Sequence, residues 1–220
     1  MRALLPFAWS RLPAAVAPLR KAFYCADLFE TRVRYVPCPS RPSCLLFTSQ
    51  NGVRAYLAQD WVFEEVPAYC VGQETFALAK MKGLKAHFLG APPALDLMET
   101  FPKDQALWLS GAHIAADLQV PRIPIYDRHI RSFVEAQALE VVQSNQIRNV
   151  FLTSGQLISW VQCKGLFFQG AAVLSERLAA IAKADLPMLE QLWIVPDFES
   201  GVRTLYASSF EEKGFDHERA

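Results

Sequence analysis

A predicted strand that ends in hydroxyl residues and leads directly into a helix lies in the first half of this sequence. The apolar residues 45–47 are followed by Thr48 and Ser49, and an expected turn at Asn51 and Gly52 precedes a helical pattern. A buried strand of this kind delivers its last hydroxyl groups to a strand-to-helix loop. Loops of this type are typical of folds in which strands alternate with helices.

The same pattern returns later in the chain. Residues 150–158 repeat it, so that Ser154 corresponds to Ser49. The segments 71–80 and 173–182 also match each other, because each is a strand end, a polar loop and the start of a helix. A third, shorter match follows in the same order. Matches of this length and order predict two related domains rather than a solenoid of short units.

Length and composition agree with two domains. The chain has 220 residues, of which 52% are hydrophobic and 20% charged, so each half can bury a core of its own. Lys and Arg together number 22, as do Asp and Glu, which gives zero net charge. This balance argues against a nucleic-acid partner. An anionic small ligand stays possible, because the N–H groups at helix starts bind anions without net charge.

Cysteine and histidine usage indicates neither disulfides nor a metal. The five cysteines are scattered and lack paired spacing: Cys25, Cys38, Cys44, Cys70 and Cys163. Free thiols in a reducing cytosol are the natural interpretation. The four histidines form no ligand cluster along the sequence. We therefore expect no metal site.

The start of the chain does not match the pattern of a signal peptide. Pro6, Ser10 and Arg11 interrupt its short apolar run, and no later segment approaches an uninterrupted transmembrane span. A cytoplasmic protein without a membrane partner is the expectation.

Alternating strands and helices predict an α/β protein with two similar domains, each a parallel sheet flanked by helices. A proline-rich linker at 37–40 and a second linker at 123–128 are expected to form a two-stranded hinge. They bound an inserted domain, 41–122. Short helices are expected within it at 95–101 and 113–118.

The two chain ends are expected to form the other domain. Residues 1–36 supply strand, helix and strand but no sheet of their own, and the C-terminal half-unit is short of strands. Parsimony therefore joins residues 1–36 with residues 129–220 in one discontinuous domain.

Three motifs on this layout resemble uroporphyrinogen-III synthase. The family pattern FTS-x-NG-V is met by residues 47–53, and the pattern VG-x-x-T by residues 71–75, before a helix that ends at Gly83. The strand before the second crossing carries a tyrosine in that family, and here it carries Tyr126. Two motifs depart from the family pattern. Residues 4–7 lack the Thr-Arg-Pro that often follows the first strand, and residues 174–177 lack the usual Gly-Thr. Both segments belong to the discontinuous domain.

The resemblance implies an enzyme that closes a linear tetrapyrrole, hydroxymethylbilane, into uroporphyrinogen III while inverting the last pyrrole ring. It also implies a monomer that needs no cofactor. The uncatalysed ring closes without inversion, so the enzyme must hold the substrate for the disfavoured attack. It must also stabilise the cation that develops as hydroxide leaves.

The resemblance makes Tyr126 the candidate catalytic residue, as donor or orienter for the departing hydroxyl group. The alternative is a hinge tyrosine packed under the linker. The candidate substrate-binding residues lie in strand-to-helix loops: Ser49, Asn51, Gly52, Thr75, Ser154 and Ser175. Hydroxyl and N–H groups there could bind the substrate's carboxylates. Thr75 is expected as a helix N-cap, and for the hydroxyl residues a purely structural capping role is the alternative.

Two other functions stay open from the sequence. The departures in the discontinuous domain motivate a non-catalytic, two-domain tetrapyrrole-binding relative. A two-domain solute-binding protein is a third reading, and the absence of a convincing signal peptide counts against it.

Overall fold

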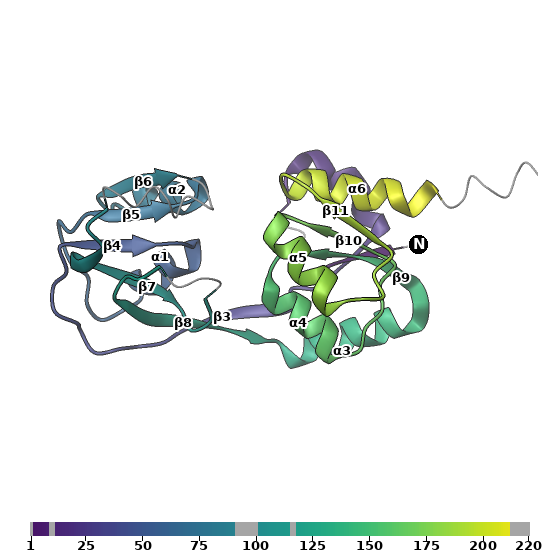
Figure 1. Cartoon of the computed structure of the whole chain (residues 1–220), viewed down its shortest axis with the longest axis horizontal. Coiled ribbons are helices and arrows are strands. Elements are labelled where there is room, and N and C mark those ends of the chain that lie inside the picture. Colours follow the sequence, from purple (N-terminus) through teal and green to yellow (C-terminus); the bar gives the residue numbers. More distant parts are fainter. Residues whose placement is uncertain (1, 9–11, 91–100, 115–117, 212–220) are drawn as a thin grey trace, which may run out of the picture. The chain divides into compact units, whose positions relative to one another are not determined.

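The chain folds into two compact units, each with its own parallel sheet (Figure 1). The computed structural model describes residues 2–8, 12–90, 101–114 and 118–211. The terminal unit comprises Met1–Glu30 and Ile130–Ala220, and the central unit comprises Thr31–His129. The predicted fold class, α/β with two similar units of parallel strands and flanking helices, is confirmed.

The terminal unit is built on a five-stranded sheet in the order β11-β10-β9-β1-β2, with every neighbouring pair parallel. Its strands are β1 (Arg2–Leu5), β2 (Phe23–Cys25), β9 (Ile147–Leu152), β10 (Gly170–Val173) and β11 (Gln191–Ile194). The start of the chain thus supplies two strands to a sheet that the C-terminal half completes.

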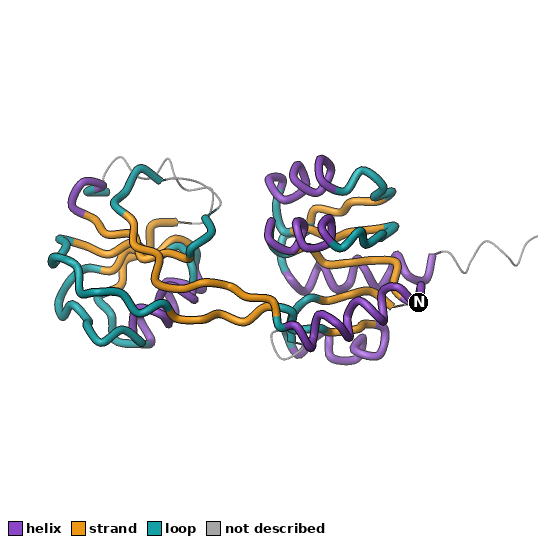
Figure 2. The backbone as a smooth tube through the Cα atoms, turned by 90° about the horizontal axis from the view of Figure 1, so that it is seen from below, coloured by secondary structure: helices purple, strands orange, loops and turns teal. Residues whose placement is uncertain are grey.

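Helices cover both faces of this sheet (Figure 2). They are the 3-10 helix η2 (Ala14–Ala22), α3 (Ser132–Val141) with the π-helical turn η5 (Val142–Gln146), α4 (Gly155–Cys163), α5 (Glu176–Asp185) and α6 (Phe198–Glu211). Side chains of α3, α4 and α5 pack on one face, and those of η2 and α6 pack on the other. Burial on both faces explains why these strands read as continuous apolar runs.

The central unit is built on a six-stranded sheet in the order β3-β8-β7-β4-β5-β6. Its strands are β3 (Phe29–Val33), β4 (Cys44–Phe47), β5 (Ala68–Val71), β6 (Ala86–Gly90), β7 (Ala106–Gly111) and β8 (Arg122–Ile130). The helices α1 (Gln50–Leu57) and α2 (Gln73–Met81) pack on one face of this sheet, and a short 3-10 turn η4 (Lys103–Gln105) precedes β7. The pairings from β8 to β6 are parallel, so these strands end at one edge.

The chain passes between the units within β3 and β8, which are neighbours in the sheet. The first crossing therefore precedes the expected linker at 37–40. Side chains of the central unit hold the chain just before that linker: the Gln59 amide bonds Val36 N and Arg34 O, and Trp61 Nε1 donates to Val36 O at 2.9 Å. These bonds keep the proline-rich segment on the central unit.

The second crossing lies at the end of β8, where the units divide between His129 and Ile130. The expected hinge segment 123–128, which was predicted to begin as a strand carrying Tyr126, forms the middle of β8 and pairs with the last residues of β7. β7 offers this segment a ladder of backbone hydrogen bonds.

Two other expectations fall on parts of the chain that lie partly or wholly outside the described residues. These are the short helices at 95–101 and 113–118. Among the residues that are described, no helix has the length and apolar character needed to cross a bilayer.

Gly201 marks a close approach between α6 and β9. A Cβ atom at this position would lie 2.3 Å from Cζ of Phe151, whose ring is fully buried. We expect Gly201→Ala to lower the free energy of unfolding by about 1–3 kcal/mol, because an added methyl group would overpack this face. Urea denaturation followed by circular dichroism measures the change.

Gly155→Ala is the matched control, because it also adds one methyl group at a helix start in the same unit. Its Cβ would meet only Ile181 Cδ1, at the ordinary contact distance of 3.9 Å. This variant should be as stable as the parent protein or up to about 1 kcal/mol more stable. Equal stability of Gly201→Ala and the parent would contradict the packing described here.

Candidate active site

Ser49 connects β4 to α1 and caps the helix. Its backbone is extended, with φ −157° and ψ 151°, and its Oγ accepts a hydrogen bond from Gly52 N at 3.1 Å. A serine cap of this kind stabilises a helix by about 1 kcal/mol. Because the cap stands at Ser49, α1 already includes Asn51 and Gly52. The expected turn at these two residues was wrong, since they form the first turn of the helix.

Tyr126 reaches this cap from two strands away. Its phenol oxygen lies 2.8 Å from Ser49 Oγ, and either group could be the donor. Tyr126 stands on β8 and Ser49 follows β4, with β7 between them in the sheet. The structure thus brings together the candidate catalytic residue and one candidate binding residue, both within the central unit.

Gly111, the last residue of β7, lies directly beneath the tyrosine ring. A Cβ atom at this position would lie 2.9 Å from Cε2 and Cζ of Tyr126 and 3.1 Å from its oxygen. The pairing of β7 with β8 shifts here, from Ser110 opposite Pro124 to Gly111 opposite Tyr126. The irregularity places the ring over the one position of β7 that has no side chain.

Gly52 also permits a close approach. A Cβ atom on Gly52 would lie 2.9 Å from the carbonyl oxygen of Leu109, so its absence lets α1 lie against β7. The Gly52 N–H group is bonded to Ser49. Asn51, beside it in the first turn, is partly exposed. The structure therefore gives Gly52 a packing role and leaves Asn51 at the edge where the parallel strands end.

Thr75 does not cap α2, so that expectation was wrong. The N-cap is Gly72, which has a positive φ of 86°, and Thr75 is the third residue of the helix. The cap position requires backbone outside the helical region, which glycine adopts here at no steric cost. Thr75 is 5% exposed and its N–H bonds Gly72 O at 3.1 Å. It lies next to the α1 site, because β5 neighbours β4.

A hydrogen bond between side chains joins the starts of α1 and α2. Gln50 Nε2 donates to Glu74 Oε2 at 2.8 Å. The two helix N-termini of the central unit are therefore held close together, at the edge where Ser49 and Tyr126 meet.

Ser154 and Ser175 have the corresponding positions in the terminal unit. Ser154 caps α4 by accepting from Leu157 N, and Ser175 caps α5 by accepting from Leu178 N, both at 3.3 Å. The backbone of Ser154, with φ −159° and ψ 154°, nearly matches that of Ser49. The strands that precede these serines, β9 and β10, are neighbours, so both caps lie at one edge of the sheet.

Two histidines lie near Asp127, the residue that follows Tyr126 on β8. The carboxylate of Asp127 lies 3.9 Å from His113 Nε2 and 3.7 Å from His129 Nε2, and it accepts from Arg128 N at 2.7 Å. Across the part of the chain that the structure describes, no three His, Cys, Asp or Glu side chains are grouped as ligands for a metal ion.

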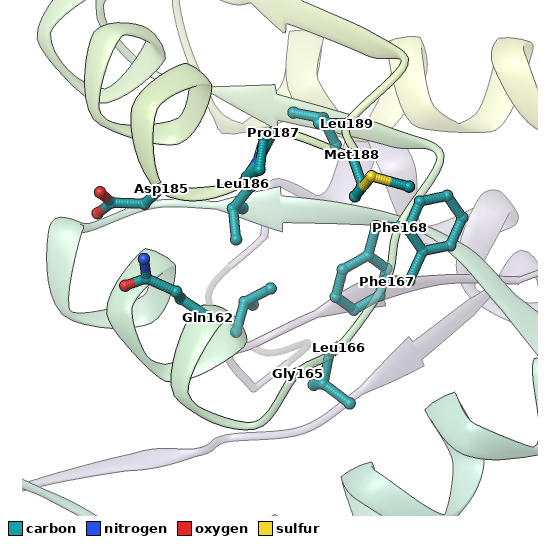
Figure 3. Close-up of a pocket in the computed structure, with 11 residues that line it drawn as sticks. Gln162, Gly165, Leu166, Phe167, Phe168, Asp185, Leu186, Pro187, Met188 and Leu189 are labelled. Atoms are coloured by element: carbon teal, nitrogen blue, oxygen red, sulfur yellow. The ribbon is translucent and has the colours of Figure 1, made fainter.

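The terminal unit has a pocket of about 220 Å³ (Figure 3), and neither Ser154 nor Ser175 lines it. It lies between the connections that precede β10 and β11, and Met188 stands beside the rings of Phe167 and Phe168 (Figure 3). These are the amino ends of the parallel strands. Ligand sites in open α/β sheets form at the carboxyl ends. The edge with the serine caps is therefore the better candidate for an active site.

The shielded thiols of Cys25, Cys44 and Cys70 are not candidate nucleophiles. Burial raises the pKa of Cys70 to about 12 and that of Cys25 to about 11, where the nearby Arg20 charge offsets part of the effect. Burial also raises the pKa of Cys44. A raised pKa keeps a thiol protonated near neutral pH, and the protonated form is a poor nucleophile.

We expect a disulfide reagent to modify two thiols of the folded protein rapidly at pH 8. These are the exposed Cys38 and Cys163, because the other three thiols are shielded and have raised pKa values. The absorbance of the thiolate that the reagent releases gives the number of modified cysteines. Unfolding in guanidinium should make the remaining three cysteines reactive. Replacing both exposed cysteines by serine removes the rapid phase. Rapid reaction of a third thiol would contradict the burial described.

The sequence made Ser49 and Tyr126 candidate site residues but did not single out Gly111, which lies against the Tyr126 ring. The available signal was the pair Ser110-Gly111 at the end of an apolar run, which has too little glycine for a nucleotide-binding loop. Thr48 belongs to the same loop as Ser49, but its hydroxyl accepts from Trp108 Nε1 at 3.3 Å.

Comparison with solved structures identifies the same two-unit fold elsewhere. A crystal structure of uroporphyrinogen-III synthetase from Helicobacter pylori matches with a TM-score of 0.66 at 16% identity, covering 94% of this chain and 100% of that chain. A mutant uroporphyrinogen III synthase from Thermus thermophilus matches with a TM-score of 0.60 at 10% identity, covering 96% and 100%. The resemblance noted in the motifs is thus confirmed at the level of the fold.

Comparisons based on sequence find no relative. No protein-family model matches the chain, and no curated protein matches it.

Proposed function

We propose that this protein is a uroporphyrinogen-III synthase, which cyclises hydroxymethylbilane to uroporphyrinogen III and inverts the last pyrrole ring. The observation that carries the proposal is the hydrogen bond between Tyr126 and Ser49, 2.8 Å long, at the carboxyl edge of a parallel sheet. The fold shared with solved synthases supports it.

Tyr126 has the chemistry that the first step needs. Loss of the terminal hydroxyl group breaks a carbon–oxygen bond, and the electron pair leaves with the oxygen. A proton from the phenol lets that oxygen depart as water. The phenolate that remains stabilises the positive charge on the substrate. The ring carbon that finally closes the macrocycle releases a proton, which restores the phenol.

The starts of the capped helices suit the substrate's carboxylates. A helix start offers N–H groups and the positive end of the helix dipole, and both favour an anion. In this proposal Asn51 and Thr75, in the first turns of α1 and α2, and Ser154 and Ser175, the caps of α4 and α5, lie at the helix starts that bind these carboxylates. Binding at several loops holds the substrate for the disfavoured attack on the last ring.

The protein in this proposal acts in the cytoplasm as a monomer and needs no cofactor. The departures from the family pattern at residues 4–7 and 174–177 favour one competing function, a tetrapyrrole-binding relative without activity. The isomer assay described next distinguishes the two.

The test supplies hydroxymethylbilane made in situ, oxidises the products and separates the type I and type III isomers. We expect the protein to produce an excess of type III isomer. Tyr126→Phe should lower the rate of type III formation by about 10²-fold, because it removes the proton donor and keeps the ring.

Tyr35→Phe is the matched control, since this tyrosine also lies in the central unit but is 68% exposed. Its rate should equal that of the parent protein. Formation of type I isomer alone by a folded parent protein would overturn the enzyme proposal and leave the binding relative. Unchanged turnover by Tyr126→Phe would remove Tyr126 from the mechanism.

A further inference from the structure

We propose that Ser49 and Gly111 are positioning residues for Tyr126, so that Ser49 serves the turnover step rather than substrate binding. The kinetic consequence of this inference rests on the proposed function, whereas the geometry behind the inference does not. Neither residue needs to touch the substrate: Ser49 sets the direction of the phenol proton, and Gly111 sets the place of the ring.

The hydrogen bonds at Ser49 favour one direction. A serine hydroxyl has one proton and two acceptor lone pairs. Ser49 Oγ already accepts from Gly52 N at 3.1 Å, and its remaining strong partner is the Tyr126 oxygen at 2.8 Å. When Ser49 donates its proton to Tyr126, the phenol proton is left free to point away from Ser49.

The start of α1 supports this direction. The helix dipole places partial positive charge at its N-terminus, and a hydroxyl group that accepts from a helix N–H becomes a better donor. The chain of bonds then runs from Gly52 N–H to Ser49 and from Ser49 to Tyr126. It ends on a phenol whose own proton is available to the oxygen that leaves the substrate.

Gly111 makes the contact between Ser49 and Tyr126 possible. The phenol must cross the end of β7 to reach Ser49, because β7 lies between β8 and β4. Any side chain at Gly111 would overlap the ring, since even a Cβ atom would lie 2.9 Å from it. Neighbouring heavy atoms at that distance must move apart, and the ring is the part that can shift. A residue other than glycine would therefore displace the phenol from Ser49.

Ser154 serves as a control that distinguishes a positioning role from a capping role. It caps α4 with nearly the same backbone angles as Ser49. Within the described part of the chain, its hydroxyl group bonds to Leu157 N and not to a tyrosine. Replacing either serine by glycine keeps an acceptable cap at a cost of a few tenths of a kcal/mol. Only the change at Ser49 removes a bond to a phenol.

The first measurement is the NMR resonance of tyrosine Cζ in the full-length free protein labelled with ¹³Cζ-tyrosine. Tyr126→Phe assigns the Tyr126 signal. Ser49→Gly and Gly111→Ala should each shift this signal, because both break the bond to its oxygen. Ser154→Gly should leave it in place, and Ser49→Thr, which keeps a hydroxyl group, should restore it. An unmoved Tyr126 signal in folded Ser49→Gly would overturn the inference whatever the protein catalyses.

The second measurement is steady-state kinetics of type III formation. We expect Ser49→Gly and Gly111→Ala to lower kcat about tenfold with KM changed less than about twofold, and Ser49→Thr to recover most of kcat. A raised KM with unchanged kcat in Ser49→Gly would make Ser49 a substrate contact and overturn the inference. If the parent protein forms no type III isomer, the proposed function fails, and the NMR signal alone decides whether Ser49 and Gly111 position Tyr126.

Discussion

One oxygen atom, Oγ of Ser49, connects the fold of the central unit to its candidate chemistry. Ser49 follows β4, and its Oγ caps α1 through Gly52 N and bonds the phenol of Tyr126. These contacts hold only when β4, β7 and β8 stand side by side in one register. A slip of one residue would turn every side chain of a strand to the opposite face, so the site and the core depend on the same alignment.

The terminal unit, as far as the structure describes it, repeats the serine cap of the central unit but not the bond to a tyrosine. Ser154 and Ser175 cap their helices as Ser49 does, after buried parallel strands. A serine that ends an apolar strand and begins a helix satisfies backbone groups locally, whatever the rest of the sequence. Because such caps need few particular residues elsewhere in the chain, the fold can be shared with solved synthases at only 10–16% identity. In the central unit the cap at Ser49 also contacts the phenol of Tyr126, which can donate a proton.

The sequence predicted what local pattern determines. The strand predicted at 45–47 lies within β4, and Ser49 follows this strand as expected. What sequence reasoning missed depends on contacts between distant residues. Ser49 and Tyr126 are 77 positions apart, and nothing in either segment shows that a ring must cross Gly111 to join them. The first crossing lies within β3, before the expected linker at 37–40, because contacts between distant residues decide where the units divide.

The most direct test of this account is a double-mutant cycle on kcat for type III formation, with Ser49→Gly, Tyr126→Phe and the double variant. A positioning residue loses its effect when the group that it positions is absent. The account predicts that the double variant turns over within about twofold of Tyr126→Phe alone. Losses that multiply, so that the double variant is slower by the product of both single effects, would show that Ser49 acts independently of Tyr126 and would contradict it.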